Sequence, residues 1–324
     1  MPDPISLTDG PEFILPFAAP PAEQAPALLG RLRLPHLERL LNRLQAGPLD
    51  EGPDDSFSPP HERALARASG LDAGADGCMP WAAVAAAGRA DSRSEPDRAW
   101  AWISPCHWQV GTSQVRCGLP TDLDEADSRA LLAVVRPFFE EDGLRLDYHA
   151  PGQWLASGAA FDGLRTASLD RVAGRDIQTW LPPSPAMRAL RRLQSEIQML
   201  LYTHPLSEQR SAAGLAPVNA FWISACGRLP AGWTPPPAGL VEQVTHLREP
   251  ALQGRWDAWL QAWQALDEGL LAELLRRCEA GGALRLTLCG ERHAQSFGPG
   301  RCRPWPRLRQ LIRPLSAAQV LERL

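Results

Sequence analysis

The sequence contains no lysine, and all 33 of its basic residues are arginine. This absence excludes Schiff-base chemistry, a lysine general base and the lysine of a P-loop. Long apolar runs are missing too: the longest run of small apolar residues, Trp81 to Ala87, is far below the roughly 20 residues of a membrane span. The first residues, MPDPISLTDG, lack the basic and apolar regions of a signal peptide. We therefore expect no membrane association.

The seven cysteines form no C-x-x-C pair. Their odd number, in a chain without an export signal, predicts reduced thiols and a cytoplasmic protein. Cys106 and His107 are adjacent in a predicted strand. Neighbouring strand residues point to opposite faces, so the two cannot converge on one ion. We expect buried thiols rather than a zinc site.

The composition fits a folded protein of about two domains. The 324 residues are 44% hydrophobic and 22% charged, with a net charge of −4, which is ample for a core. The mild acidity argues against nucleic acid as the main partner. An arginine-rich C-terminal region leaves nucleic acid or an acidic protein partner open, although solvated surface arginines are the simpler interpretation. These arginines are Arg301, Arg303, Arg307, Arg309 and Arg313.

Apolar periodicity predicts alternating strands and helices along most of the chain. Residues 47–60, rich in Gly, Pro and Asp, are expected to be a loop. From Trp100 onward the order strand, strand, helix, strand, strand predicts a compact α+β unit. The predicted strands are 13–18, 101–110, 115–119, 144–148, 153–156, 218–224, 284–288 and 294–297, and the main predicted helices are 22–45, 61–68, 186–203, 255–278 and 316–323.

Several polar and aromatic residues are given structural roles. His204 is expected to cap the end of the preceding helix, where a cation suits the helix dipole. Asn219 is expected to satisfy backbone groups beside a strand. A stripe of Trp256, Trp259 and Trp263 at helical spacing could stack on bases, but a stripe that faces the core is the favoured interpretation.

A central block carries a family resemblance. Residues 204–210 read HPLSEQR, residues 214–219 read GLAPVN and residues 226–230 read CGRLP. This succession resembles a stretch of the archaeal-type, cofactor-independent phosphoglycerate mutases. From Ile14 to about Phe297 the chain also resembles a bacterial group of RpfE-type regulatory proteins, which are often named phosphoglycerate mutase by similarity.

The resemblance implies an α/β fold of the alkaline-phosphatase-like superfamily, with a three-layer core sheet and an inserted α+β domain. On this basis we predict the first part of the core at 11–98, the inserted domain at 99–185, the second part of the core at 186–300 and an Arg/Pro-rich tail at 301–324. The family's chemistry uses two divalent metals held by Asp and His, and a serine nucleophile. The metals clamp the phosphoryl oxygens and activate the nucleophile.

Most of the family's ligands are replaced here. The first strand runs into Phe17 and Ala18, where the family has an Asp. The position of a metal Asp is Ala251, and that of a metal His is Arg255. The serine position falls on His61. An alanine cannot ligate a metal, and an arginine places a fixed positive charge there, so the sequence predicts a degenerate metal site and no cofactor.

The leading hypothesis is therefore a non-catalytic, mutase-like pseudoenzyme with a regulatory or phosphate-ligand-binding role. An anion such as a phosphorylated small molecule would be bound without metal by cationic side chains. The candidates for this site are Arg228, Arg248, Arg255 and His246.

The alternative hypothesis is an active metal-dependent mutase or phosphatase whose ligands have moved. It would require two Mn²⁺ or Zn²⁺ ions, and the candidate ligands are Glu291, His293 and Asp257.

His61 is the one candidate for a catalytic role. It could accept a phosphoryl group or act as acid or base, with Glu62 orienting it. The favoured alternative is a helix N-terminal turn, with Pro60 at an early position and Glu62 facing the dipole. Ser58, just upstream, is either a nucleophile or a capping residue.

Overall fold

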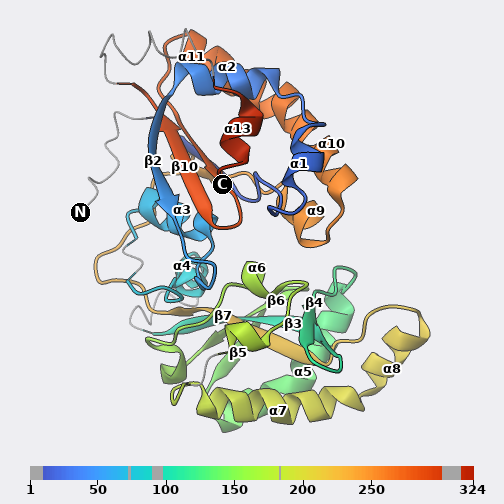
Figure 1. The fold of residues 1–324 in the computed structure, drawn as a ribbon. Coiled ribbons are helices and arrows are strands. Elements are labelled where there is room, and N and C mark those ends of the chain that lie inside the picture. Colours follow the sequence, from blue (N-terminus) through green and yellow to red (C-terminus); the bar gives the residue numbers. More distant parts are fainter. Residues whose placement is uncertain (1–9, 72–73, 90–97, 182–183, 301–314) are drawn as a thin grey trace. The chain divides into compact units, whose positions relative to one another are not determined.

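The computed structural model describes residues 10–71, 74–89, 98–181, 184–300 and 315–324. The chain forms two compact units (Figure 1). Unit 1 comprises Met1–Asp54, Pro59–Asp72 and Thr234–Leu324, and unit 2 comprises Asp55–Ser58 and Ala73–Trp233. No helix in the described part of the chain has both the length and the apolarity needed to cross a bilayer.

Unit 1 is built on a five-stranded sheet in the order β2-β10-β9-β1-β8. β1 is parallel to both of its neighbours, and β10 is antiparallel to β9 and β2. The strands are β1 (Glu12–Leu15), β2 (Gln45–Glu51), β8 (Val241–Gln243), β9 (Arg285–Cys289) and β10 (His293–Gly298). The helices are α1 (Ala25–Leu29), α2 (Pro35–Arg43), α3 (Pro60–Ala68), α9 (Arg248–Leu252), α10 (Trp256–Leu266), α11 (Ala272–Glu279) and α13 (Ala317–Leu321).

Helices cover both faces of this sheet. Phe13 and Leu15 point toward a large apolar core formed with α2, α10 and α11, which lie together in Figure 1. Ile14 alternates to the other face, where it packs against Ala64 and Ala68 of α3. The alternation of strand side chains therefore assigns successive β1 residues to two different helical layers.

The long predicted helix over 255–278 is confirmed, with an interruption at its centre. The π-helical turn η5 (Asp267–Leu271) separates α10 from α11. It carries Asp267, which is buried and accepts hydrogen bonds from the backbone N–H groups of His36 (3.2 Å) and Leu37 (2.8 Å). Because Leu34, the N-cap residue of α2, makes no side-chain cap bond, Asp267 supplies the missing cap from another helix.

Unit 2 has an antiparallel sheet in the order β7-β3-β6-β5, with β4 paired to the far end of β3. The succession β3, α5, β5, β6, α7, β7 with this order is the split β-α-β arrangement of ferredoxin-like sheets. The strands are β3 (Trp100–Val110), β4 (Val115–Gly118), β5 (Arg145–Ala150), β6 (Gln153–Ser157) and β7 (Ala220–Gly227). The helices are α4 (Trp81–Ala87), α5 (Glu125–Glu141), α6 (Leu169–Val172), α7 (Arg188–Tyr202) and α8 (Pro205–Ala212), with short 3₁₀ turns η3 (Ala159–Phe161) and η4 (Gln178–Trp180).

Each face of the unit 2 sheet has its own apolar core. α5 and α7 pack on one face around Trp154, Phe139 and Phe221. On the other face, α4 packs against Trp100 and Trp102, and a separate cluster around Trp222 lies near α6. The chain is thus a mixed α/β protein with two multistranded sheets.

The division of the chain differs from the predicted boundaries. Residues 186–233 were assigned to the core, but β7 pairs with β3 over most of its length and α7 packs on β7. Residues 73–98 were also assigned to the core, yet α4 packs on β3 and β7. An apolar pattern in the sequence predicts a buried strand but not the strand that it pairs with. The pairing strand decides to which unit a segment belongs.

Two local predictions are wrong. Residues 47–51, at the start of the predicted loop over 47–60, belong to strand β2. Pro48 and Gly47 are tolerated in this edge strand, which pairs with β10 through an irregular register. His204 does not cap the end of α7. It is the N-cap residue of α8, where its Nδ1 accepts from the N–H of Leu206 at 3.3 Å, since Pro205 is suited to begin a helix.

The last residues of the chain are part of the unit 1 core. The predicted last helix is confirmed as α13, and Val320 and Leu321 are buried in the unit 1 core. The arginines predicted as a charged cluster, 301 to 313, lie outside the described residues.

We expect Asp267→Ala to destabilise unit 1 by about 1–3 kcal/mol, because two backbone N–H groups at the start of α2 lose their acceptor in a buried place. Urea unfolding measures the change. Asp257→Ala, which removes an exposed carboxylate paired with Arg31 at 2.9 Å, is the control and should cost less than about 0.5 kcal/mol. Equal effects of the two variants would show that the cap contributes nothing.

Candidate functional site

The carboxyl ends of the parallel strands in unit 1 are the natural place for a ligand site. Three loops leave this edge: the loop after β1 begins at Pro16, the loop after β8 at Val244 and the loop after β9 at Gly290. Backbone hydrogen bonds hold them together, because Val244 N donates to Ile14 O and Ala18 N donates to Cys289 O, both at 2.8 Å. Most of the predicted site residues of unit 1 lie near this edge. His246 and Glu291 are on the loops, and Arg248, Arg255 and Asp257 are on α9 or at the start of α10. His293 begins β10, and His61 is on α3, which follows β2.

Two tryptophans fix the loop after β1. Trp259 Nε1 donates to the carbonyl of Phe17 at 2.9 Å, and Trp263 Nε1 donates to that of Ala18 at 3.2 Å. Phe17 has a φ of +56°, a backbone conformation that costs energy for a residue with a side chain. The core-facing interpretation of the tryptophan stripe is confirmed, since Trp259 and Trp263 are fully buried. The sequence did not indicate that their indoles bind this loop.

His61 lies in the first turn of α3, as the structural interpretation predicts, with Glu62 beside it and Pro59 as the N-cap residue. Its side chain is buried, and its ring centre lies 5.4 Å from that of Phe17. The helix therefore brings an imidazole against the loop that follows β1. A catalytic role for His61 stays a prediction.

The loop between β8 and α10 carries three of the four predicted anion-binding residues. His246 is exposed, Arg248 begins α9 and Arg255 is the N-cap residue of α10. The guanidinium of Arg255 donates to Glu249 Oε1 at 3.0 Å. This ion pair is exposed, and exposed pairs contribute only about 0–1 kcal/mol. A stronger anionic partner could therefore displace Glu249.

The fourth candidate, Arg228, belongs to unit 2. It follows β7 and forms a two-pronged ion pair with Asp162, in which Nε donates to Oδ1 at 2.8 Å and Nη2 donates to Oδ2 at 2.5 Å. Such paired bonds are the strong form of an arginine–carboxylate contact. Asp162 thus occupies the donor face that an anion would use.

The alternative metal ligands do not form a ligand group. Asp257 pairs with Arg31 at 2.9 Å, Glu291 lies in the turn between β9 and β10, and the N–H of His293 donates to the carbonyl of Leu324 at 3.1 Å. Within the described ranges, no three His, Cys, Asp or Glu side chains are placed to hold one metal ion. The identity of any cofactor stays a prediction.

Ser58 has a structural environment within unit 2. Its hydroxyl accepts from the N–H of Gly77 at 2.9 Å, and its own N–H donates to Asp76 Oδ1 at 3.0 Å. Asp76 also accepts from Ser56 Oγ at 2.8 Å and from Phe57 N at 2.9 Å. Burial acts to raise the pKa of Asp76, but these hydrogen bonds outweigh it and hold the pKa below 3.8, its ordinary value. The carboxylate therefore fixes residues 56–58. No spacing in the sequence indicated this role.

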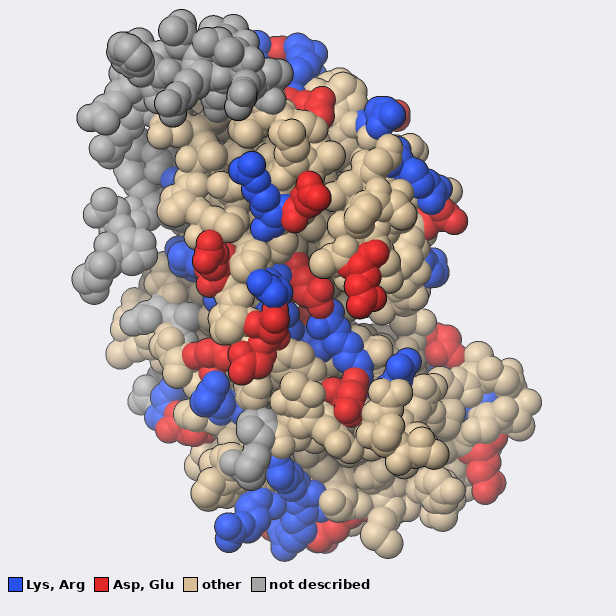
Figure 2. Space-filling view, viewed as in Figure 1, with Lys and Arg blue, Asp and Glu red and all other residues tan. Residues whose placement is uncertain are grey.

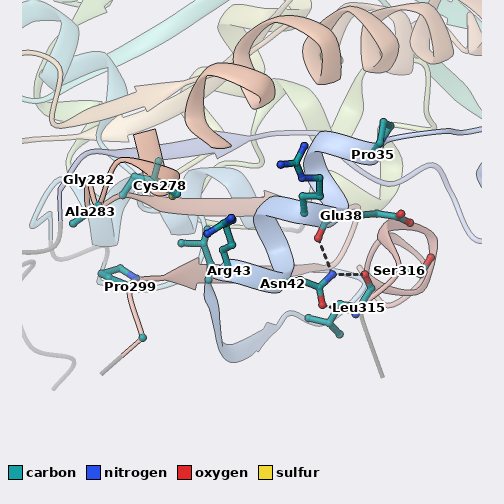
Figure 3. A pocket seen from close by; sticks show the side chains of 15 residues that line it. Pro35, Glu38, Asn42, Arg43, Cys278, Gly282, Ala283, Pro299, Leu315 and Ser316 are labelled. Atoms are coloured by element: carbon teal, nitrogen blue, oxygen red, sulfur yellow. Dashed lines mark hydrogen bonds between the residues drawn. The ribbon is translucent and has the colours of Figure 1, made fainter. Parts of the chain in front are cut away.

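Unit 1 also has a large open hollow between α2, α11 and the start of α13 (Figure 3). Its volume is about 1040 Å³. Asn42 bridges its wall by donating to the carbonyls of Glu38 and Leu315. Arg39 and Arg43 both bind Glu279 Oε1, at 2.8 and 3.1 Å, so a carboxylate already offsets their charge.

Comparison with solved structures finds only distant similarities in fold. One solved structure, a cofactor-independent phosphoglycerate mutase from Thermoplasma acidophilum, is 11% identical with a TM-score of 0.35 over 89% of each chain. Another, the PH0037 protein from Pyrococcus horikoshii, is 11% identical with a TM-score of 0.42 over 90% of this chain and 88% of that one. No protein-family model and no curated protein matches the chain.

We expect Trp259→Phe to loosen the loop after β1, because the Phe17 carbonyl loses its donor and a small cavity opens. Unfolding experiments should show a loss of about 2–3 kcal/mol, and hydrogen exchange of the Ala18 amide should accelerate. Trp256→Phe, on the same helix and only partly buried, is the control and should leave the Ala18 amide unchanged. Equal exchange in the two variants would contradict the role of the indole.

We expect Asp76→Asn to destabilise unit 2 at neutral pH by about 1 kcal/mol. The folded pKa of Asp76 is lowered, so its stabilising effect is present above the ordinary pKa and is lost as the pH falls through the folded pKa. The difference between wild type and variant should therefore shrink in urea unfolding at about pH 3. A difference in stability that stays the same at both pH values would refute the role of the Asp76 carboxylate. Asp162→Asn is the control for a more exposed carboxylate of the same unit.

Proposed function

We propose that this chain is a non-catalytic protein on a phosphoglycerate-mutase-like, alkaline-phosphatase-like frame, with a regulatory role that depends on binding a phosphorylated small molecule. The proposed site is the carboxyl edge of the unit 1 sheet. The proposal rests on the sequence resemblance together with the side chains that occupy this edge.

The observation that carries the proposal is the loop after β1. Where the resemblance implies a metal-binding carboxylate, the chain has Phe17 and Ala18, and their carbonyls are held by the indoles of Trp259 and Trp263. An aromatic ring and a methyl group offer no oxygen ligand to a cation. The loop is thus built from apolar groups.

Cationic groups on the next loop favour an anion. His246, Arg248 and Arg255 lie within ten residues of one another, and Arg255 stands at the N-terminus of α10, which has no side-chain cap. A helix N-terminus and an arginine both attract phosphate. A phosphate dianion is a stronger partner for Arg255 than the exposed carboxylate of Glu249, so we expect the ligand to exchange with that carboxylate.

The first experiment measures bound metal, mutase and phosphatase activity, and thermal stability with 3-phosphoglycerate. We expect less than one Mn²⁺ or Zn²⁺ per chain, no turnover, and stabilisation by the phosphate ester. Two bound metals with turnover would overturn the proposal in favour of an active enzyme. If the protein holds no metal and 3-phosphoglycerate does not stabilise it, the phosphate-binding part of the proposal is overturned. The next search would then be for a macromolecular partner.

Two variants test the role of Arg255. Arg255→Glu should weaken binding of 3-phosphoglycerate about tenfold, and Glu249→Gln should strengthen it, because the arginine no longer has a competing carboxylate. Titration calorimetry gives both values. Arg129→Glu is the matched control, since Arg129 also forms an exposed ion pair, at 2.8 Å with Glu125, but in unit 2. An unchanged affinity in Arg255→Glu would remove Arg255 from the site.

A further inference from the structure

Unit 2 contains a partly open cavity that is unrelated to the proposed phosphate site. It lies between the start of α7, strand β7 and the loop at 163–167, and its volume is about 340 Å³. This is within the range of roughly 300–1,000 Å³ that small-molecule sites occupy. All of the residues that line it belong to unit 2.

Buried apolar side chains form one part of the cavity wall. The principal apolar wall residues are Leu164, Trp180, Met187, Trp222 and Ile223. Each of these side chains is buried.

Trp222 is held by its indole, which donates to the carbonyl of Ala167 at 2.9 Å. The ring of Trp180 packs edge-on against that of Phe57. Two rigid aromatic side chains therefore form part of a preformed surface suited to a flat apolar group.

One wall residue presents an unused polar atom. Gln194, on the second turn of α7, is only 6% exposed. Its amide nitrogen donates to the carbonyl of Phe221 at 3.1 Å, but its amide oxygen accepts no hydrogen bond from any residue that the structure describes. Because Gln194 lines the cavity and this oxygen has no donor among the described residues, an N–H or O–H group of a ligand can donate to it.

Arginines are concentrated at the start of α7, beside the cavity. α7 begins with Arg188, Arg191 and Arg192 and has no acidic residue in its first turn, which is contrary to the usual preference of a helix N-terminus. Figure 2 shows basic side chains gathered over this part of α7. Arg191 itself lines the cavity, and its Nη2 donates to the carbonyl of Leu181 at 2.8 Å. Helix end and guanidinium together favour a negative group in the ligand.

We propose that this cavity is a binding site for a small organic acid with a flat apolar body and one carboxylate. The apolar body lies between Trp180 and Trp222, the carboxylate faces Arg191 at the start of α7, and a hydroxyl or amino group on the body donates to the oxygen of Gln194. The site does not depend on the proposed function in unit 1.

The test uses two probes of nearly the same shape, the anion naphthalene-1-acetate and the neutral naphthalene-1-acetamide, with the full chain and titration calorimetry. We expect the acid to bind with a one-to-one stoichiometry and the amide to bind about tenfold more weakly. Added salt should weaken the acid more than the amide. Because 3-phosphoglycerate lacks an apolar body, we expect it not to compete with the acid.

Three variants locate the binding. Arg191→Met keeps the apolar stem but removes the charge, and it should make the acid and the amide bind equally. Arg191→Lys should restore part of the difference. Ala186→Trp fills the cavity from an exposed wall position and should abolish both. Arg192→Met is the control, because Arg192 is on the same turn, outside the cavity lining, and pairs with Asp142.

Three results would overturn the proposal: no binding of either probe, equal binding of acid and amide by the wild type, or acid binding that survives both Ala186→Trp and Arg191→Met. Loss of binding in Arg192→Met to the same extent as in Arg191→Met would also count against it. Circular dichroism of each variant separates loss of binding from loss of folding.

Discussion

The parallel pairing of β1 with β8 and β9 is the constraint on which unit 1 depends. Glu12 lies beside Val241 on one side and Arg285 on the other, so the sheet forms only when segments from both ends of the chain meet. The same pairing brings the three loops of the carboxyl edge together. Trp259 and Trp263 then bind the loop after β1 from α10, which links the helical layer to the edge. The proposed phosphate site therefore depends on contacts between distant parts of the sequence.

Unit 2 depends on an equivalent closure. β7 returns to pair with β3, and Gln194 of α7 binds the backbone of β7. This closure also creates the cavity, because Trp222 of β7 forms one wall and the start of α7 forms another. The two proposed sites thus lie in separate units and use different chemistry. One offers cations on a loop to a phosphate, and the other offers aromatic walls and a helix end to an organic acid.

The sequence predicted most elements because apolar periodicity follows the local geometry of the backbone. The helices at 61–68 and 186–203 and the strands around Trp102 and Ile14 are confirmed. Asn219 was also predicted correctly: its side chain bonds both backbone groups of Trp108, at 2.7 and 3.1 Å. β2 was missed because its residues, which include Gly47 and Pro48, are typical of a loop. It is a strand because it pairs with β10, which lies far away in the sequence. The helix cap that Asp267 supplies and the backbone contacts of Asp76 with residues 57 and 58 were missed because their partners are distant in sequence.

The sequence by itself determined the absence of lysine chemistry and the local elements, since these follow from residue identity and short-range spacing. Only the tertiary structure decided which unit β7 joins, that Arg228 is bound by Asp162 and Arg255 by Glu249, and that Gln194 faces a cavity. The physical reason is that hydrogen bonds, ion pairs and cavities depend on distances between residues that are far apart along the chain. Such distances are set by packing rather than by periodicity.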